Sequence, residues 1–225
     1  MLRQTPPTFH FHKVGDWQWV TDHRGYFWTL SRTHLYIALV AVLIGFLVAL
    51  PLGVLAVRVP RTNPPILAVT TILYALPSLA VFAFLVGITG LTNNTVILPL
   101  AAYALAILVR SVTNGLNNVA EEVRISATAM GYGPLRRLVS VELPAAVPVI
   151  IAGLRVTTVA SISLVTVGSL IGIGGLGQLF IAGENTDFIT EILAGVVIVA
   201  FWAFLLDGLL LLSGRLLAPW ARVSS

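Results

Sequence analysis

The chain has 225 residues, of which 57% are hydrophobic and only 10% are charged, with a mean hydropathy of +0.96. These values exclude an ordinary water-soluble domain and are typical of a polytopic membrane protein. The net charge of +4 comes almost wholly from arginine, which favours orientation at a membrane surface over nucleic-acid binding. The chain contains no cysteine, so we expect neither disulfides nor a thiolate metal site, and no other pattern predicts a metal.

The first 33 residues carry charges throughout, unlike a signal peptide, so we expect the first span to drive insertion and to remain in the mature protein. Several aromatic residues precede that span, among them Trp17, Trp19 and Trp28. Aromatic rings with polar edges favour the headgroup layer, which predicts a tail at 1–33 with an interfacial helix at 16–32. An ordered tail that packs on a partner explains the same residues.

The apolar stretches predict an all-α fold with five transmembrane helices. A bilayer core about 30 Å thick needs about 20 apolar residues per helix. The 48 residues from Thr62 to Val109 contain no charged side chain and are long enough for two crossings and a turn. We expect one transmembrane domain at 34–220, a short tail at 221–225, and spans at about 35–57, 66–86, 95–112, 145–169 and 189–212.

The distribution of basic residues predicts how the chain is oriented. One side of the membrane receives eight arginines, namely Arg58, Arg61, Arg110, Arg124, Arg136, Arg137, Arg215 and Arg222. The opposite connections, 87–94 and 183–191, receive none, although the amino-terminal tail carries four basic residues. Because basic loops stay in the cytoplasm, we expect the carboxyl terminus inside and the amino terminus outside.

A polar insert at about 113–144 separates the third and fourth spans. Residues 119–130 can form a helix whose acids, Glu121 and Glu122, stand near its positive end. Gly131 and Gly133-Pro134 break this helix, and Pro134 can open a second short helix at 135–141. A rigid helix–turn–helix knob outside the membrane predicts a docking element for a soluble partner.

This insert resembles the cytoplasmic loop of binding-protein-dependent ABC importer permeases. That loop reads Glu-Ala-Ala, three residues, Gly, nine residues, then Ile-x-Leu-Pro. The corresponding residues, at matching spacing, are Ile125-Ser126-Ala127, Gly131 and Val141 followed by Leu143-Pro144. In that family the loop forms a coupling helix that enters a groove of the ATPase subunit. The resemblance extends from about His34 to Trp220 and covers the predicted membrane domain.

The resemblance implies a set of partners and a location. ATP and Mg would be bound by a separate ATPase dimer, and this chain, which has no phosphate-binding Gly-Lys-Ser/Thr loop, would carry no cofactor and no catalytic residue. A second copy or a homologous permease would complete the channel in the bacterial cytoplasmic (inner) membrane. Some relatives carry a fused binding domain, whereas this chain ends at Ser225, so we expect a separate extracytoplasmic binding protein.

One departure from the family motif concerns its acidic first position, which is Ile125 here. Isoleucine cannot make the hydrogen bonds of a carboxylate. Either Glu121 or Glu122 compensates one turn earlier, or docking depends on shape and apolar contact alone. Of these two, we favour docking through shape and apolar contact.

Several other stretches resemble the osmoprotectant branch of the family, which imports glycine betaine, carnitine, choline or proline. They are Leu76-Pro77-Ser78-Leu79-Ala80, Ala152-Gly153-Leu154-Arg155 and the glycine-rich run 168–177. Methionine-type permeases share the length and span number and remain an alternative. A secondary transporter is disfavoured, because the sequence shows neither a clear internal repeat nor a chain of ionisable residues in its spans.

The second and third spans contain candidate pathway residues. Pro77 removes one backbone hydrogen bond in the middle of its span and frees a carbonyl group that Ser78 or water could satisfy. The resulting kink either lines the pathway or is simply packed against its neighbours. Tyr74 and Tyr103 could offer ring faces to a quaternary ammonium through cation–π attraction, although buried tyrosines more often pack or bond between helices.

The glycine-rich run has two interpretations. Gly168 and Gly172 have the spacing of close helix contacts, whereas a bent segment that includes Gly172 and Gly174 could move as the pathway opens.

Arg155 and Asp207 are the charges that we place inside spans, where an unpaired charge is costly. We therefore expect them to form an ion pair between the fourth and fifth spans.

Overall fold

The computed structural model describes residues 17–222, so the predictions for 1–16 and 223–225 lie outside the described chain. Within residues 17–222 all regular structure is helical, which confirms the predicted all-α fold. The longer elements are α1 (Trp17–Asp22), α2 (Arg24–Arg58), α3 (Asn63–Ala75), α4 (Ser78–Thr89), α5 (Asn93–Asn117), α6 (Glu121–Ala129), α7 (Pro134–Arg137), α8 (Leu143–Val165), α9 (Gln178–Asn185) and α10 (Ile189–Leu217).

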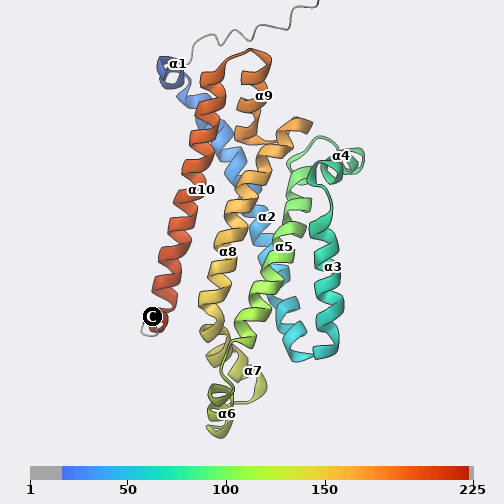
Figure 1. Ribbon diagram of the computed structural model, residues 1–225, viewed down its shortest axis with the longest axis vertical. Helices are drawn as coiled ribbons and strands as arrows, with labels where there is room; N and C mark the ends of the chain where they lie inside the picture. Colours follow the sequence, from blue (N-terminus) through green and yellow to red (C-terminus); the bar gives the residue numbers. More distant parts are fainter. Residues whose placement is uncertain (1–16, 223–225) are drawn as a thin grey trace, which may run out of the picture.

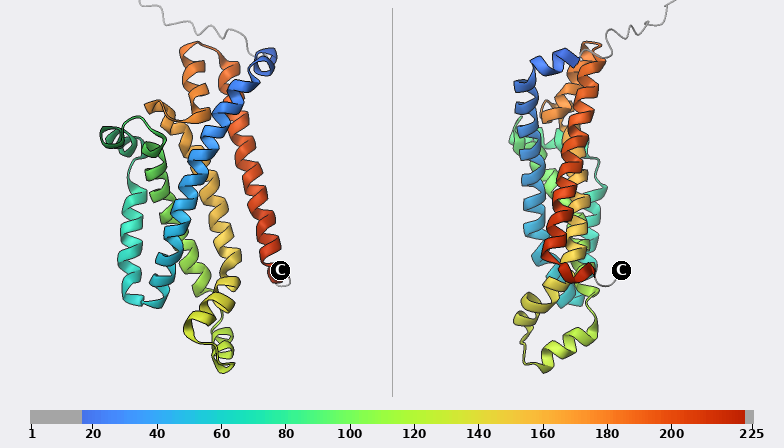
Figure 2. Two further views of the ribbon diagram at one scale, coloured as in Figure 1. Left: turned by 180° about the vertical axis from the view of Figure 1, so that it is seen from behind. Right: turned by 90° about the vertical axis from the view of Figure 1, so that its left-hand side faces the viewer.

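Four helical stretches are long and apolar enough to cross a membrane: α2, α5, α10 and the continuous stretch Pro134–Ile171 that contains α8. A bent pair, Pro60–Ala75 and Ser78–Thr89, supplies a fifth candidate. In Figure 1, α10, α8, α5 and α3 stand side by side, and α2 crosses behind α8 and α5. Figure 2 shows α1 and α9 at one end of the bundle, and α6 and α7 at the other.

The second predicted span, 66–86, is not one straight helix, although the bent pair still supplies the fifth candidate span. The chain turns by 88° between the two helices of the bent pair. The residue before a proline is pushed toward extended backbone, and Leu76 has φ −68° and ψ 135°. Phe82 is fully buried in the core with Ile37, Leu100 and Ile162, so this contact holds α4 across the bundle.

Small residues allow the central helices to approach closely. A Cβ atom added to Gly45 or Gly53 of α2 would lie 2.6 Å from the side chain of Ala104 or Val112 of α5. A Cβ on Gly153 of α8 would collide with Ser111 of α5. In a membrane no hydrophobic effect drives helices together, because the lipid is as apolar as the side chains. Close contacts of this kind stabilise the bundle through van der Waals packing instead.

The helix predicted at 16–32 is divided in its described part, and its location at the membrane interface stays a prediction. The helix breaks at His23, and residues from Arg24 onward belong to α2, the first span. The rings of Trp19 and Phe188 meet edge to face at 5.1 Å, and Trp19 packs against the cluster that contains Phe27 and Leu179. The segment therefore packs on the chain's own α9–α10 region.

The third span is longer than predicted, so Arg110, which the predicted span 95–112 already contained, lies further from its end. Because α5 continues to Asn117, seven more helical residues follow Arg110. Its Nη2 donates a 2.6 Å hydrogen bond to Oγ1 of Thr71 on α3. The count of arginines at this end of the bundle falls by one, and the charge asymmetry between the two ends persists.

Candidate docking site and transport pathway

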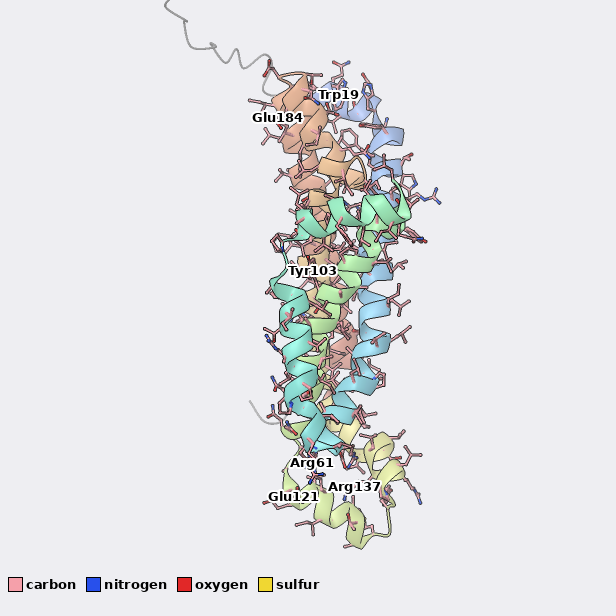
Figure 3. The ribbon with its side chains drawn as sticks, turned by 90° about the vertical axis from the view of Figure 1, so that its right-hand side faces the viewer. Trp19, Arg61, Tyr103, Glu121, Arg137 and Glu184 are labelled. Atoms are coloured by element: carbon pink, nitrogen blue, oxygen red, sulfur yellow. The ribbon has the colours of Figure 1, made fainter. Side chains whose placement is uncertain are left out.

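The insert stands beyond the ends of α5 and α8, at the opposite end of the molecule from α1 (Figures 1 and 2). Figure 3 shows Arg61, Glu121 and Arg137 at this end, and Trp19 and Glu184 at the other. The predicted first helix is present as α6, followed by Gly131 with φ +83°, a left-handed conformation that favours glycine.

The second helix of the insert does not end at Leu143-Pro144 as predicted. It begins at Pro134, as expected, and runs through a π-helical turn, Leu138–Glu142, directly into α8. The turn ends just before Pro144, which has no N–H to donate, and such one-residue expansions are a known way for a helix to absorb a local mismatch. Leu143 and Pro144 therefore form the first turn of α8.

An arginine joins α6 to the end of α5. Nη2 of Arg124 donates a 2.7 Å hydrogen bond to the carbonyl oxygen of Leu116 in the last turn of α5, which also accepts from the N–H of Val119 at 3.2 Å. Nη1 of Arg124 lies 3.4 Å from Oε2 of Glu121 in an exposed pair. Glu121 is thus engaged within the insert, while Glu122 is exposed.

The motif residues of the insert face different ways. Ala127 is only 1% exposed and packs inward, whereas Ile125 is 62% exposed and Ser126 is exposed as well. Gly131 lies in open space, with nothing described within 4 Å of an added Cβ atom. We call the exposed apolar side chains of this region the insert surface; they are Val123, Ile125, Met130, Leu135 and Val139.

A buried carboxylate, Glu142, holds the base of the insert, and sequence reasoning missed it. The residue is 1% exposed. Its Oε2 lies 3.0 Å from Nη2 of Arg58 at the end of α2, and its Oε1 lies 2.8 Å from Nε of Arg137. Nη1 of Arg137 in turn donates a 2.9 Å hydrogen bond to Oγ1 of Thr128 on α6. The sequence signal that could have identified Glu142 is an acid at the start of an apolar span, close to several arginines.

The two candidate tyrosines meet at the α3–α4 break. Their rings form an edge-to-face pair with centroids 6.1 Å apart. Tyr103 is 5% exposed and its hydroxyl donates a 3.0 Å hydrogen bond to the carbonyl oxygen of Leu76, while Tyr74 is 53% exposed. Tyr103, and not Ser78, satisfies the carbonyl at the break; Ser78 begins α4. Of the two rings, Tyr74 offers the accessible surface.

The glycine-rich run forms a bend between α8 and α9. A 3₁₀ turn, Thr166–Ile171, ends at Gly172 with φ +82°, and Gly175 has φ +49°. Gly174 packs closely on Ser169, but an added Cβ on Gly172 would meet nothing described within 4 Å. Of the two glycines whose spacing suggested a helix contact, Gly168 approaches α5, where an added Cβ would lie 3.0 Å from Val96, and Gly172 does not. The helix α9, which follows, was not predicted.

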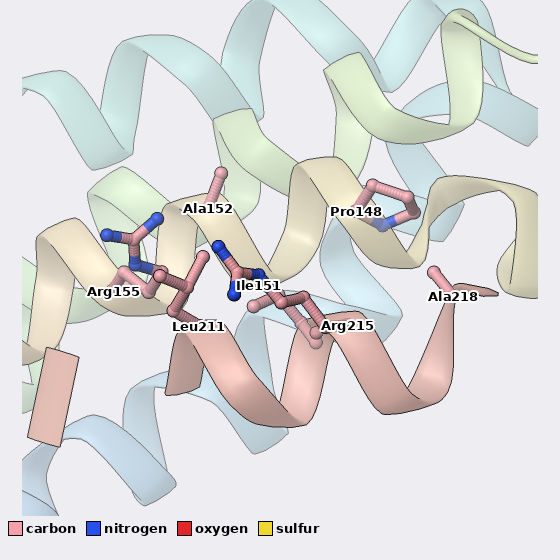
Figure 4. A pocket seen from close by; sticks show the side chains of 8 residues that line it. Pro148, Ile151, Ala152, Arg155, Leu211, Arg215 and Ala218 are labelled. Atoms are coloured by element: carbon pink, nitrogen blue, oxygen red, sulfur yellow. The ribbon is translucent and has the colours of Figure 1, made fainter. Parts of the chain in front are cut away.

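Arg155 of α8 and Asp207 of α10 form the two-pronged ion pair that the sequence led us to expect. Nε and Nη2 of Arg155 each lie 2.8 Å from one carboxylate oxygen of Asp207. Both side chains remain about one third exposed, at 32% and 28%. Arg155 and Arg215 also line a cavity of about 240 Å³ between the two helices, shown in Figure 4.

Comparison with known proteins identifies the class to which this fold and insert belong. Residues 35–223 match the family described as "Binding-protein-dependent transport system inner membrane component", and the chain belongs to this family. It is therefore a permease subunit of an ABC transporter, as the insert motif predicted.

Several characterised permeases are similar over most of their length. The chain is 36% identical over 186 residues to the choline transport system permease protein OpuBB of Bacillus subtilis, covering 83% of this chain and 86% of that protein. It is 34% identical over 200 residues to the glycine betaine/carnitine/choline transport system permease protein OpuCD of Bacillus subtilis, with coverage of 88% and 87%. It is 32% identical over 197 residues to the osmoprotectant import permease protein OsmW of Salmonella typhimurium, with coverage of 85% and 92%.

Solved structures show the same fold at lower identity. A chain of the inward-facing MetNI methionine ABC transporter superposes with a TM-score of 0.67 at 24% identity, covering 84% of this chain and 95% of that one. A chain of an amino acid ABC transporter gives a TM-score of 0.74 at 18% identity, covering 90% and 99%.

Proposed function

We propose that this chain is the permease subunit of an ATP-driven importer for a small osmoprotectant such as glycine betaine, choline, carnitine or proline. A separate ATPase dimer binds ATP and Mg, and a separate extracytoplasmic binding protein delivers the solute. A second copy of the chain, or a homologous permease, completes the pathway in the bacterial cytoplasmic membrane. The observation that carries the proposal is the insert surface on a helix–turn–helix at one end of the bundle, in register with the family's coupling loop.

The exposed apolar residues support docking of a protein at the insert. Met130 and Leu135 are 69% and 73% exposed on a segment that stands clear of the membrane-length helices. Apolar side chains grouped on a water-facing projection mark an interaction site more often than chance exposure does. Helix α6 therefore binds the ATPase groove through complementary shape and apolar contacts.

The replacement of the family's acid by Ile125 fits the same interpretation. Glu121 is the nearer acid in the first turn, and it already pairs with Arg124 inside the insert. The side chain of Ile125 points to solvent and lies in the insert surface. Glu121 is therefore the weaker candidate to replace the missing acid. Ile125 instead contacts an apolar wall of the ATPase groove.

Charge supports an orientation with the insert in the cytoplasm. Arg58, Arg61, Arg124, Arg136 and Arg137 lie at the insert end. At the other end, Glu184 lies in the last turn of α9 and Asp187 in the connection to α10. By the positive-inside rule the insert and the carboxyl terminus are cytoplasmic, and the amino terminus is outside.

The relatives support an osmoprotectant as the substrate over methionine. These relatives, which are 32–36% identical to this chain, are named for choline, carnitine, glycine betaine or osmoprotectant transport. The methionine transporter resembles this chain at 24% identity, which is a likeness of fold. The partly exposed ring of Tyr74, beside the α3–α4 break, can give a quaternary ammonium a weak contact of about 0.5–2 kcal/mol in passing.

The test is uptake into proteoliposomes that contain this chain, its ATPase and its binding protein. Radiolabelled choline, glycine betaine, carnitine and methionine are compared with and without internal ATP. We expect ATP-dependent uptake of at least one quaternary ammonium and little uptake of methionine. Uptake that needs no ATPase would overturn the assignment as an ABC permease, and uptake of methionine alone would overturn the substrate class.

A surface variant tests the docking site within the same assay. Ile125→Lys places a charge on the insert surface and should abolish stimulation of ATP hydrolysis by the loaded binding protein. Leu216→Lys is the matched control, because Leu216 is an equally apolar residue, 79% exposed, at the same end of the molecule on α10. Ala127→Lys is less informative, because Ala127 is buried and its substitution would unpack α6.

A further inference from the structure

The carboxylate of Glu142 lies at the junction of three structural units. It contacts Arg58 at the end of α2, and it contacts Arg137, which in turn bonds Thr128 on α6. Glu142 itself immediately precedes Leu143, the first residue of α8. We propose that Glu142 is a positioning residue that locks the docking helix α6 to the inner ends of α2 and α8, so that the three move as one body.

The π-helical turn at Leu138–Glu142 is the local feature that makes this junction possible. In a regular α-helix, residues three and four apart face one another, whereas residues five apart point in different directions. Arg137 and Glu142 are five apart, yet Nε and Oε1 are 2.8 Å apart. Widening the helix by one residue brings the two side chains onto the same face, and such π-turns are frequent at functional sites.

The burial of Glu142 makes its two contacts specific. A carboxylate that is 1% exposed must be paired, and here both of its oxygens are used, one by each guanidinium. Arg58 and Arg137 are themselves only 31% and 24% exposed. Without Glu142, two like charges would face each other in a partly buried space, and the contact between α2 and the insert would be replaced by repulsion.

This arrangement has a mechanical consequence, which rests on the proposed function. If an ATPase moves α6, the chain itself carries the displacement through residues 118–120 into α5 and through α7 into α8. The Glu142 junction adds a path through Arg58 into α2, which packs along α5 and α8. The displacement at the docking helix therefore reaches the first span directly.

The experiment measures solute transported per ATP hydrolysed by the reconstituted transporter. Glu142→Gln keeps the size of the side chain and removes its charge. We expect the assembled complex to keep hydrolysing ATP while transport per ATP falls about tenfold, the size of a typical coupling between sites. An unchanged ratio in a normally assembled complex would overturn the proposal.

A second variant covers the case in which Glu142→Gln does not fold. Arg58→Gln leaves the Glu142–Arg137 pair in place and removes only the link to α2, so it should lower the same ratio. Arg136→Gln is the matched control, because the guanidinium of Arg136 stacks over the Tyr132 ring, 4.5 Å from its centroid, outside the junction. If Arg58→Gln and Arg136→Gln transport the same amount of solute per ATP, the contact with α2 has no role in coupling.

A distance measurement tests whether α2 and α8 move together. The chain has no cysteine, so spin labels can be attached at Leu55→Cys on α2 and Ala145→Cys on α8, both exposed. With the junction intact, we expect one narrow distance that ATP does not change. Glu142→Gln should broaden that distance and make it depend on ATP; an unaltered distribution would contradict the proposal.

These results separate the inference from the proposed function. If Ile125→Lys abolishes stimulation and the Glu142 and Arg58 variants leave the ratio unchanged, docking stands and the junction has no positioning role. If Ile125→Lys transports normally, the docking assignment itself is wrong, whatever the junction variants do.

Discussion

The hydroxyl of Tyr103 donates a hydrogen bond to the carbonyl oxygen of Leu76, 3.0 Å away, where α3 ends and α4 turns by 88°. Tyr103 lies on α5, so a central helix of the bundle satisfies the backbone at the break. In a membrane an open carbonyl has no water to accept a hydrogen from, and non-helical backbone persists only where protein groups satisfy it. The bent pair is therefore part of the packed structure.

Removing this hydroxyl should loosen the break. Tyr103→Phe keeps the ring and loses the donor, and we expect the protein to be destabilised by about 1 kcal/mol, the usual net value of one hydrogen bond. Thermal unfolding in detergent measures the loss. Tyr74→Phe, at the exposed partner ring, serves as the control and should change little; equal effects of the two variants would contradict the role given to Tyr103.

Close helix packing predicts a strong effect at one glycine and a weak one at another. A Cβ on Gly153 collides with Ser111, while a Cβ on Gly208 meets nothing described within 4 Å. Gly153→Ala should destabilise the chain by about 1–3 kcal/mol through overpacking, and Gly208→Ala should not destabilise it. The yield of monodisperse protein and its unfolding midpoint measure the difference. Similar midpoints would mean that α5 and α8 are less closely packed than described.

The Arg155–Asp207 pair predicts non-additive substitutions. Asp207→Asn leaves the guanidinium of Arg155 without its two oxygen partners, and Arg155→Gln leaves the carboxylate of Asp207 alone. Each single variant should lower thermal stability, and the double variant should recover part of the loss because no lone charge remains. Additive losses across the four proteins would show that the two side chains act independently.

The proposed orientation predicts which engineered cysteines an impermeant reagent can reach. In intact cells, Glu184→Cys in the last turn of α9 should be labelled from outside, and Ser140→Cys at the base of the insert should be labelled only after the membrane is opened. Both positions are exposed, and the parent chain has no cysteine to react. Labelling of Ser140→Cys from outside and of Glu184→Cys only in opened cells would show that the chain has the opposite orientation.

The spans and the ion pair could be predicted because each follows from a local requirement. A helix that crosses the bilayer core needs about 20 apolar residues, and a charge inside such a stretch needs a partner. Of the acids in the other predicted spans, Glu191 stands at the outer end of the fifth and Asp207 lies well inside it, so Arg155 had one evident partner. The motif around Gly131 was equally local, since its residues lie close together in the chain.

The features that the sequence did not predict depend on contacts between distant residues. Arg58 and Glu142 are 84 positions apart, and no local pattern indicates that they meet. Pro77 predicts an interruption, but the 88° turn depends on Phe82 entering the core. Arg110 was counted with the arginines at the insert end, but α5 continues past it to Asn117, and its bond to Thr71 pairs it with α3.

The most direct measurement of the central claim is cross-linking between the insert and the ATPase. Met130→Cys, at the tip of the insert surface, is combined with single cysteines along the groove of the ATPase in the active transporter. We predict a cross-link that forms rapidly, survives the Leu216→Lys control and disappears with Ile125→Lys. Uptake driven by ATP with no cross-link from Met130→Cys to any groove position would contradict docking through α6.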